Sequence, residues 1–195
     1  APSGGIWASL LLRPRRPPAE VPIYTLAAAV AVARASREAG ADARIKWPND
    51  VLVADEHGEE RKLCGILTEM EGEADRVSWL VVGPGVNANV DADALPPDAT
   101  SLRAVAGDVD RRAFLQHVLE TFYELTSAEA DVEAVLDAWR EHAATLGRRV
   151  RVDTPGGGVE GEAVDVRFPG SLVVRTDDGD ERVVHAGDCE HLRPA

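Results

Sequence analysis

Residues 45–52 read IKWPNDVL, and this stretch decides how the first half of the chain folds. Proline fixes its own φ angle, lacks a backbone N–H donor and favours extended geometry in the residue before it. Asn49 and Asp50 are typical turn residues, because their side chains can bond nearby backbone groups. The stretch therefore predicts a strand that ends around Lys46, a turn formed by Pro48, Asn49 and Asp50, and a second strand directly after it.

The segments around this turn carry clear strand and helix patterns. The run GGIWASLLLRP at 4–14 is typical of a buried strand, and helical spacing followed by a glycine predicts a helix over 23–39. Downstream, 51–54 and 62–69 predict the two strands of a hairpin. The segment RVSWLVVGPGVNANV at 76–90 predicts a further strand that ends in a glycine loop.

The second half changes character at Gly147. Amphipathic spacing predicts helices over 111–125 and 128–146. Beyond Gly147, short alternating strands are separated by glycine-bearing turns, which predicts a small β-barrel of about 50 residues. We therefore expect an α+β protein, with a mixed sheet and helices over 1–146 and a barrel over 147–195.

Composition argues against several classes of protein. The net charge of −13 argues against a nucleic-acid surface, because phosphate binding requires clustered lysine and arginine. No apolar run is long enough to span a bilayer, so no membrane segment is expected. Cys64 and Cys189 lie far apart in a chain without secretory features, which favours free thiols in the cytoplasm. His185, Cys189 and His191 lack metal-ligand spacing, so we expect no metal site.

Lysine is rare in this chain. It occurs only at Lys46 and Lys62, and arginine supplies the other 19 cations. Acidic residues spread along the whole chain, with few lysines, predict a halophile-like surface that stays soluble in concentrated salt, where screening removes self-repulsion. Lys46 stands out in such a chain, because it lies beside a turn that would hold it in place.

The segment VVGPGVNA fits the G-x-G-x-x-A pattern of dinucleotide-binding proteins, but its context does not. That motif must open a helix, whereas Pro96 and Pro97 follow closely and forbid a regular helix. Two interpretations remain. Gly83 and Gly85 either let the backbone approach a ligand, with the amide of Asn87 nearby, or simply form a turn at the strand end.

Four segments in this order, GGIWASLLL, IKWPNDVLV, KLCGILTEME and VVGPGVNANV, resemble the catalytic domain of biotin protein ligases. The second of these segments, with its lysine before Trp-Pro-Asn-Asp, is highly specific to that family within the wider biotin/lipoate ligase group. The resemblance covers the whole chain, because the family ends in an SH3-like barrel that matches residues 148–194. It implies a class II synthetase-like domain over 1–146 and an SH3-like domain over 147–195.

The resemblance implies a two-step reaction. Biotin and ATP, with Mg²⁺ on the ATP phosphates, give biotinyl-5′-AMP and pyrophosphate, and a lysine of a biotin carboxyl carrier protein then takes the biotin. Lys46 would be the catalytic cation that contacts the biotin carboxylate and the adenylate, since that step brings two anions together. Trp7 would wall the biotin rings, Gly83 and Gly85 would admit the ligand against the backbone, and Asn87 would reach the nucleotide.

The resemblance also leaves alternatives open. The family carries a G-R-G-R-x-G-R loop upstream of the segment matched by APSGG, so we expect the chain to be a truncated fragment that can be inactive alone. The alternative is a non-catalytic remnant or a module that binds biotin or the carrier protein. A lipoate ligase is disfavoured by the Trp-Pro-Asn-Asp motif. The family often pairs through its sheet, so a homodimer is allowed.

Overall fold

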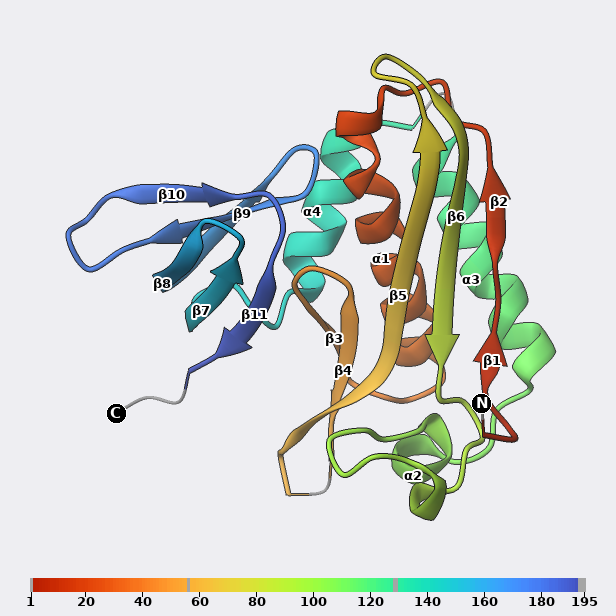
Figure 1. Ribbon diagram of the computed structural model, residues 1–195. Coiled ribbons are helices and arrows are strands. Elements are labelled where there is room, and N and C mark those ends of the chain that lie inside the picture. Colours follow the sequence, from red (N-terminus) through yellow and green to blue (C-terminus); the bar gives the residue numbers. More distant parts are fainter. Residues whose placement is uncertain (1, 56, 128–129, 193–195) are drawn as a thin grey trace.

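The computed structural model describes residues 2–55, 57–127 and 130–192, and consists of a large sheet backed by helices and a second, smaller sheet beside it (Figure 1). The large sheet is antiparallel in all its strand pairs, in the order β1-β6-β5-β4-β3, and β2 also pairs with β6. Its strands are β1 (Ile6–Trp7), β2 (Leu10–Leu12), β3 (Ala43–Lys46), β4 (Asp50–Ala54), β5 (Glu60–Gly72) and β6 (Val77–Val86).

Helices cover one face of the large sheet and leave the other open (Figure 1). The helices are α1 (Pro22–Glu38), α2 (Leu102–Ala106), α3 (Arg111–Thr126) and α4 (Val132–His142), with short 3₁₀ turns η1 (Pro18–Glu20) and η2 (Ala92–Ala94). The α1 helix contacts β3 to β6 on one side and α3 and α4 on the other. Its many alanines allow this close packing from several directions, and alanine is also the best helix former.

The smaller sheet follows the helices in sequence and has the order β10-β9-β8-β7-β11. Its strands are β7 (Arg149–Thr154), β8 (Gly157–Arg167), β9 (Ser171–Arg175), β10 (Glu181–Val184) and β11 (Asp188–His191). Within the described residues β10 and β11 do not pair, so the sheet is not closed into a barrel. The predicted α+β class is confirmed, with antiparallel strand pairs where a mixed sheet was expected. A domain boundary at 146/147 stays a prediction.

The structure corrects two strand predictions. The run at 4–14 is not a buried strand but the two short strands β1 and β2, with Trp7 and Leu11 exposed by 51% and 59%. These strands lie along an edge of the sheet, which leaves their outward-facing side chains exposed. Gly83 and Gly85 do not form a loop after the strand, because both lie inside β6 and pair with β5.

The other predicted elements lie close to their expected positions. The helix expected at 23–39 is α1, and the hairpin strands are β4 and β5. The start expected at 128 for the last long helix lies outside the described residues, and α4 ends at His142, before the predicted 146, where the chain turns towards β7. No helix among the described residues is long and apolar enough to cross a membrane.

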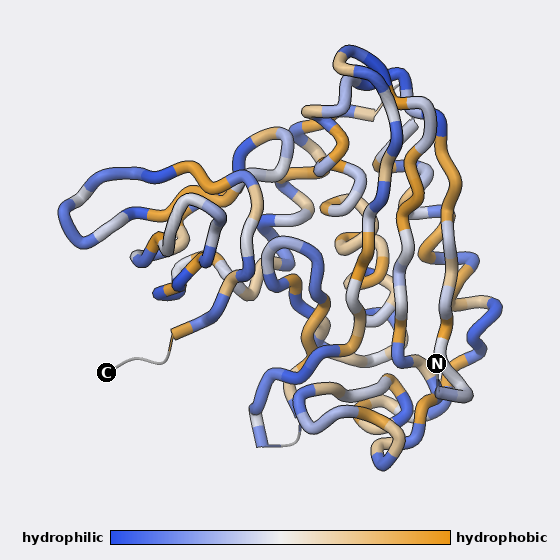
Figure 2. Tube along the Cα trace, viewed as in Figure 1, coloured by the Kyte–Doolittle hydropathy of each residue, from blue (hydrophilic) through white to orange (hydrophobic). Residues whose placement is uncertain are grey.

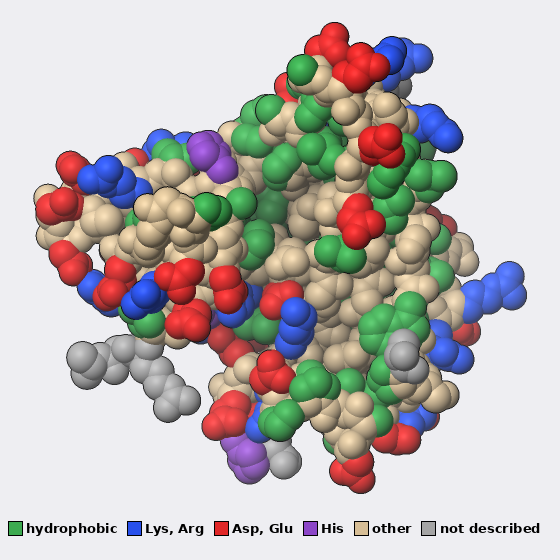
Figure 3. Space-filling view, viewed as in Figure 1, with side chains coloured by type: hydrophobic (Ala, Val, Ile, Leu, Met, Phe, Trp, Pro, Cys, Tyr) green, Lys and Arg blue, Asp and Glu red, His purple; other side chains and the backbone are tan. Residues whose placement is uncertain are grey.

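Hydropathy and charge follow these layers. Figure 2 shows hydrophilic residues at the hairpin ends of both sheets and hydrophobic residues along the strands between them. Figure 3 shows acidic side chains over much of the visible surface and a hollow between the two sheets. The salt-adapted surface inferred from composition stays a prediction.

Candidate functional site

A single row of paired residues crosses the large sheet. Trp7 pairs with Gly85, Gly85 with Gly65, Gly65 with Asp50, and Asp50 with Lys46. Directly paired residues of an antiparallel sheet project from the same face, so this row links five strands on one face. Trp7 stands at one end and Lys46 at the other, with bare glycine backbone between them.

The row lies on the open face of the sheet. The neighbours of the row residues within their strands project to the opposite face, where Ile6, Ile45, Ile66 and Val86 are buried against the helix layer. The alternation of strand side chains therefore directs the row away from the helices and towards the hollow. A ligand can reach this face without disturbing the core.

Two glycines of the row lie directly against neighbouring side chains. A Cβ atom on Gly85 would lie 2.9 Å from the indole of Trp7, so the ring lies directly over Gly85. A Cβ atom on Gly65 would lie 3.0 Å from Cε of Lys62. Gly83 has more room, since its nearest such contact is a backbone oxygen at 3.4 Å. The glycines thus leave the backbone in the middle of the row uncovered by side chains of their own.

The Trp7 end opens into an apolar cavity of about 250 Å³. Trp7, Leu67 and Gly83 are among its lining residues, and the side chain of Leu67 is 65% exposed. Exposed apolar side chains gathered around a hollow are typical of a binding surface rather than of a solvated edge. This cavity suits the ring portion of a small ligand.

The Lys46 end opens into a polar cavity of about 390 Å³, to which both sheets contribute. Lys46, Asp50 and Lys62 come from the large sheet, and Glu190 and His191 come from β11. Nζ of Lys62 lies 2.7 Å from Oδ1 of Asp50. Within the described part of the chain Lys46 forms no ion pair, so its ammonium is available to an anion.

The turn behind Lys46 is held by hydrogen bonds from three parts of the chain. Trp47 is buried, and its peptide bond to Pro48 is cis. The indole Nε1–H of Trp47 donates to the carbonyl of Gly170 at 2.8 Å, and its backbone N–H donates to Oγ1 of Thr145 at 3.0 Å. Nδ2 of Asn49 donates to the carbonyl of Ile66 at 2.9 Å. These bonds fix the direction in which Lys46 leaves the sheet.

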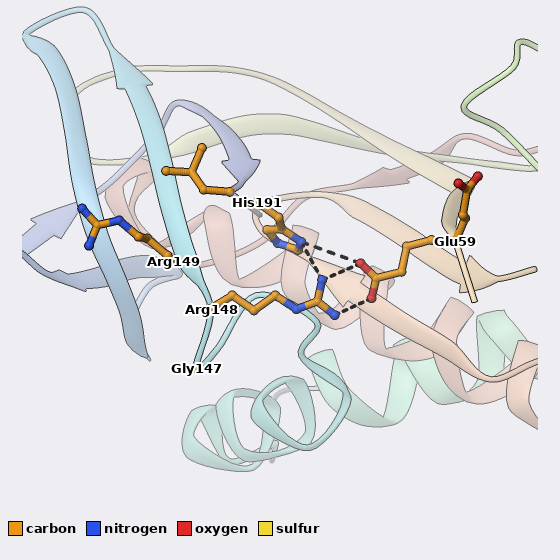
Figure 4. A pocket seen from close by; sticks show the side chains of 7 residues that line it. Glu59, Gly147, Arg148, Arg149 and His191 are labelled. Carbon is orange, nitrogen blue, oxygen red and sulfur yellow. Dashed lines mark hydrogen bonds and ion pairs between the residues drawn. The ribbon is translucent and has the colours of Figure 1, made fainter. Parts of the chain in front are cut away.

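A partly buried histidine continues this network into the smaller sheet. Nε2 of His191 lies 3.0 Å from Oγ1 of Thr145, and its Nδ1 lies 3.3 Å from Nη1 of Arg148. Arg148 in turn donates to both carboxylate oxygens of Glu60 at 2.6 Å (Figure 4). Burial, with the charges of Arg148 and Lys46, lowers the pKa of His191 to about 4. The imidazole is therefore neutral at pH 7.

The structure brings most of the predicted site residues together. Trp7, Gly85 and Lys46 share the row, and Gly83 lies beside it. Asn87 is the exception, because its Nδ2 donates to the carbonyl of Thr100 at 3.0 Å and so holds the loop that follows β6. Its backbone remains close to the end of the row.

Sequence reasoning missed several residues of the site. Gly65 and Lys62 had a signal, namely a glycine inside KLCGILTEME and the scarcity of lysine. Thr145 and Gly170 had none, because their partners lie far away in sequence, and His191 was considered only as a metal ligand. His185, considered as a metal ligand, instead lies 2.7 Å from Oγ of Ser171, and both cysteines are buried free thiols.

Two family models match the chain. The model described as the biotin/lipoate A/B protein ligase family matches residues 1–87, and the biotin protein ligase C-terminal domain matches residues 145–192. The first match contains the whole row, and the second contains the smaller sheet with His191. The fold and both matches thus place the chain in the biotin/lipoate protein ligase class, with a C-terminal domain of the biotin protein ligase type.

Two relatives indicate more closely which members of this class the chain resembles. The bifunctional ligase/repressor BirA of Bacillus subtilis is 35% identical over 193 residues, which cover 93% of this chain and 57% of the relative. The biotin–[acetyl-CoA-carboxylase] ligase of Mycobacterium tuberculosis is 35% identical over 159 residues, covering 78% and 54%. The chain therefore spans little more than half the length of these relatives.

A solved structure agrees with them. The apo biotin protein ligase of Aquifex aeolicus superimposes with a TM-score of 0.79 at 26% identity, covering 98% of this chain and 83% of that one. With both family models and these relatives, the chain belongs to the biotin protein ligase family.

Proposed function

We propose that this chain forms biotinyl-5′-AMP from biotin and ATP and then transfers biotin to a lysine of a biotin carboxyl carrier protein. The observation that carries the proposal is the row, with Trp7 at an apolar end and, at a polar end, Lys46, which forms no ion pair with the residues that the structure describes. Biotin has the same asymmetry, with an apolar ring system at one end and a carboxylate at the other.

The first step joins two anions. A carboxylate oxygen of biotin attacks the α-phosphorus of ATP, the bond to the β-phosphate bridging oxygen breaks, and pyrophosphate leaves. Mg²⁺ would enter on the ATP phosphates and offset part of their charge. Lys46 would lie between the carboxylate and the α-phosphate and stabilise the charge that builds up there. A fixed cation that needs no reorganisation is the effective form of such stabilisation.

The second step transfers the acyl group. The neutral amine of the acceptor lysine attacks the carbonyl carbon of the mixed anhydride, the bond to the phosphate oxygen breaks, and AMP leaves. Trp7 and Gly83 would hold the biotin rings through both steps, with Gly85 bringing the backbone close to the ligand. Asn87 would meet the nucleotide through its backbone, since its side chain is engaged with Thr100.

Three proposals concern the setting of this activity. Pro48 and Asn49, with Asp50 at the start of β4, would form the structural turn that aims Lys46. A homodimer is proposed through the large sheet, whose edge exposes Leu11. The cytoplasm is the proposed compartment, because it is where free thiols persist.

The test is biotin-dependent pyrophosphate release from radiolabelled ATP by the whole gene product that carries this chain. We expect release to require biotin and Mg²⁺, and label from biotin to appear on a carrier domain with its acceptor lysine but not on a Lys→Arg carrier. Binding of biotin without any pyrophosphate release would instead indicate a non-catalytic binding module.

A further inference from the structure

We propose that the helix layer carries a second ligand site, a cavity between α1, α3 and α4 that binds a phosphate group. The cavity has a volume of about 410 Å³, and all its lining residues belong to these three helices. The helices cover one face of the large sheet, whereas the row with Lys46 lies on the open face (Figure 1). Binding in this cavity would therefore be independent of the proposed ligase reaction.

Each of the three helices contributes a polar side chain that has no partner. Nε2 of His142, at the end of α4, is buried and forms no hydrogen bond within the described residues. Thr121 of α3 is only 7% exposed, and in the same part of the chain its hydroxyl forms none either. The partly buried Arg34 of α1 makes neither an ion pair nor a hydrogen bond with any residue that the structure describes. Buried polar groups normally have hydrogen-bond partners, so these three side chains together indicate a polar ligand.

The hydrogen-bonding groups of the cavity favour an anion. A guanidinium has five N–H donors and no acceptor, and its planar shape matches a pair of phosphate oxygens. Arg34 is free to bind in this way, whereas Arg37 is already bonded to Asp42 and donates to the carbonyl of Ala43 at 3.3 Å. Arg34 is therefore the main charged donor, and Arg37 adds positive charge nearby.

His142 supplies a neutral donor. Burial lowers the pKa of His142, and the charges of Arg34 and Arg37 act in the same direction, against the opposite effect of Glu141. The ring is therefore neutral at pH 7 and has one N–H to donate. A neutral donor beside a guanidinium suits an oxyanion, because neither group has to lose a proton when the anion binds.

Two carboxylates also line the cavity, and both lie at its exposed rim. Glu38 is 68% exposed, and its Oε2 lies 3.2 Å from Nδ1 of His117. Glu141 is exposed as well. Water and salt screen exposed charges, so these carboxylates oppose an anion less than the partly buried Arg34 attracts it. Among the described residues no group of three or more His, Cys, Asp or Glu side chains could hold a metal ion, which also favours an anion here.

The test follows the imidazole nitrogen signals of the full chain by NMR during a titration with inorganic phosphate at pH 7. Sodium chloride holds the ionic strength constant, so that screening does not change. We expect the signals of His142 to shift and saturate, because its Nε2 lines the cavity. The signals of His185, which lies outside the cavity beside Ser171, should not move.

Arg34→Gln should weaken phosphate binding about tenfold, because it removes the charged donor. Thr121→Val removes a hydroxyl at similar volume and should weaken binding about threefold. Arg112→Gln is the matched control, since Arg112 is exposed on α3, lies outside the cavity and has no ion pair within the described residues. This control should keep the wild-type affinity, and thermal unfolding checks that each variant is folded.

A titration with AMP separates two sources of the phosphate group. Binding at His142 that is no tighter than that of inorganic phosphate identifies the free ion as the ligand, and tighter binding identifies a nucleotide. The absence of a saturable shift with either ligand would overturn the proposal, as would equal losses in Arg34→Gln and Arg112→Gln. Loss of the His142 shift in Lys46→Ala would also overturn it, because the anion would then bind at the row.

Discussion

The two ends of the row are built in different ways. At the Lys46 end, Trp47 is buried and bonded to Gly170 and Thr145, which belong to distant parts of the chain. At the Trp7 end, β1 is a two-residue edge strand, and the indole is 51% exposed over Gly85. One end is fixed by tertiary hydrogen bonds and the other by local register and a glycine.

The difference follows from what each end has to bind. A charge stabilises an anion only if it is aimed and held while the reaction occurs, so the position of Lys46 has to be rigid. An apolar surface binds a ligand in proportion to the apolar area that the contact buries, and this area depends only weakly on the orientation of the side chain. Changes in the turn that holds Lys46 should therefore alter stability and rate together, whereas changes at the Trp7 end should alter binding alone.

Lys46→Ala is expected to give the largest effect, a loss of about 10²–10³-fold in adenylation, because an aimed charge in the site contributes several kcal/mol to the transition state. The fold should remain, since Lys46 forms no ion pair within the described residues. Pyrophosphate release and thermal unfolding measure the two outcomes. Lys46→Arg should not restore the rate, because a planar guanidinium differs from a point charge. Full activity in Lys46→Ala would remove its catalytic role.

The pH dependence of stability should report the protonation of His191, which is partly buried. Its pKa is about 4 in the folded chain and about 6.5 when unfolded, so the unfolded state binds more protons between these values. His191 therefore contributes stability that is fully present above pH 6.5 and falls by about 3 kcal/mol as the pH drops to 4. Denaturant unfolding of the wild type and of His191→Asn, measured across this range, isolates the effect. Parallel pH profiles would show that His191 does not titrate as described.

Trp47→Phe tests the hydrogen bond that ties the Lys46 turn to the carbonyl of Gly170. It removes the Nε1–H donor and leaves the buried carbonyl of Gly170 without that partner, which costs about 1–3 kcal/mol. The free energy of unfolding in denaturant measures this cost. Adenylation should fall as well, because the turn loses its contact with the smaller sheet. Unchanged stability would mean that water replaces the indole N–H as the donor to Gly170, and that this hydrogen bond contributes less to the free energy of unfolding than its geometry suggests.

Trp7→Ala should have the smallest effect on stability, below about 1 kcal/mol, because the ring is half exposed on an edge strand. The affinity of the Trp7→Ala variant for biotin should nevertheless fall, since the indole surface against which the biotin rings would pack is lost. Calorimetric titration beside thermal unfolding separates the two quantities. A large loss of stability would show that the Trp7 end is structural, and would remove the contrast between the ends of the row.

Sequence predicted the local parts of the fold well. The turn predicted at 48–50 lies one residue earlier, at 47–49, because Asp50 already belongs to β4. The turn and its strands follow from proline and Asn-Asp chemistry, and α1 follows from alanine-rich helical spacing. The edge position of β1 and β2 could not be predicted, because an apolar run does not reveal which neighbours cover it. The position of Gly83 and Gly85 inside β6 was missed for the same reason: glycine marks both turns and close approaches within a sheet.

The site was predicted at its ends but not in its middle. Lys46 and Trp7 carry distinctive motifs, whereas Gly65 acquires its place only through the register of β4, β5 and β6. Thr145 and His191 support the Lys46 turn from more than 90 residues away, a contact no local pattern encodes. Residues that act through tertiary hydrogen bonds are thus the ones that sequence reasoning misses.

The most direct measurement compares the affinities of biotin and biotinamide for the wild type and Lys46→Ala by calorimetric titration. Biotinamide keeps the rings but lacks the carboxylate. We predict that Lys46→Ala lowers the affinity for biotin at least tenfold, by about 1.4 kcal/mol or more, and leaves the affinity for biotinamide unchanged. An equal loss for both ligands, or no loss for either, would contradict the assignment of the carboxylate to the Lys46 end of the row.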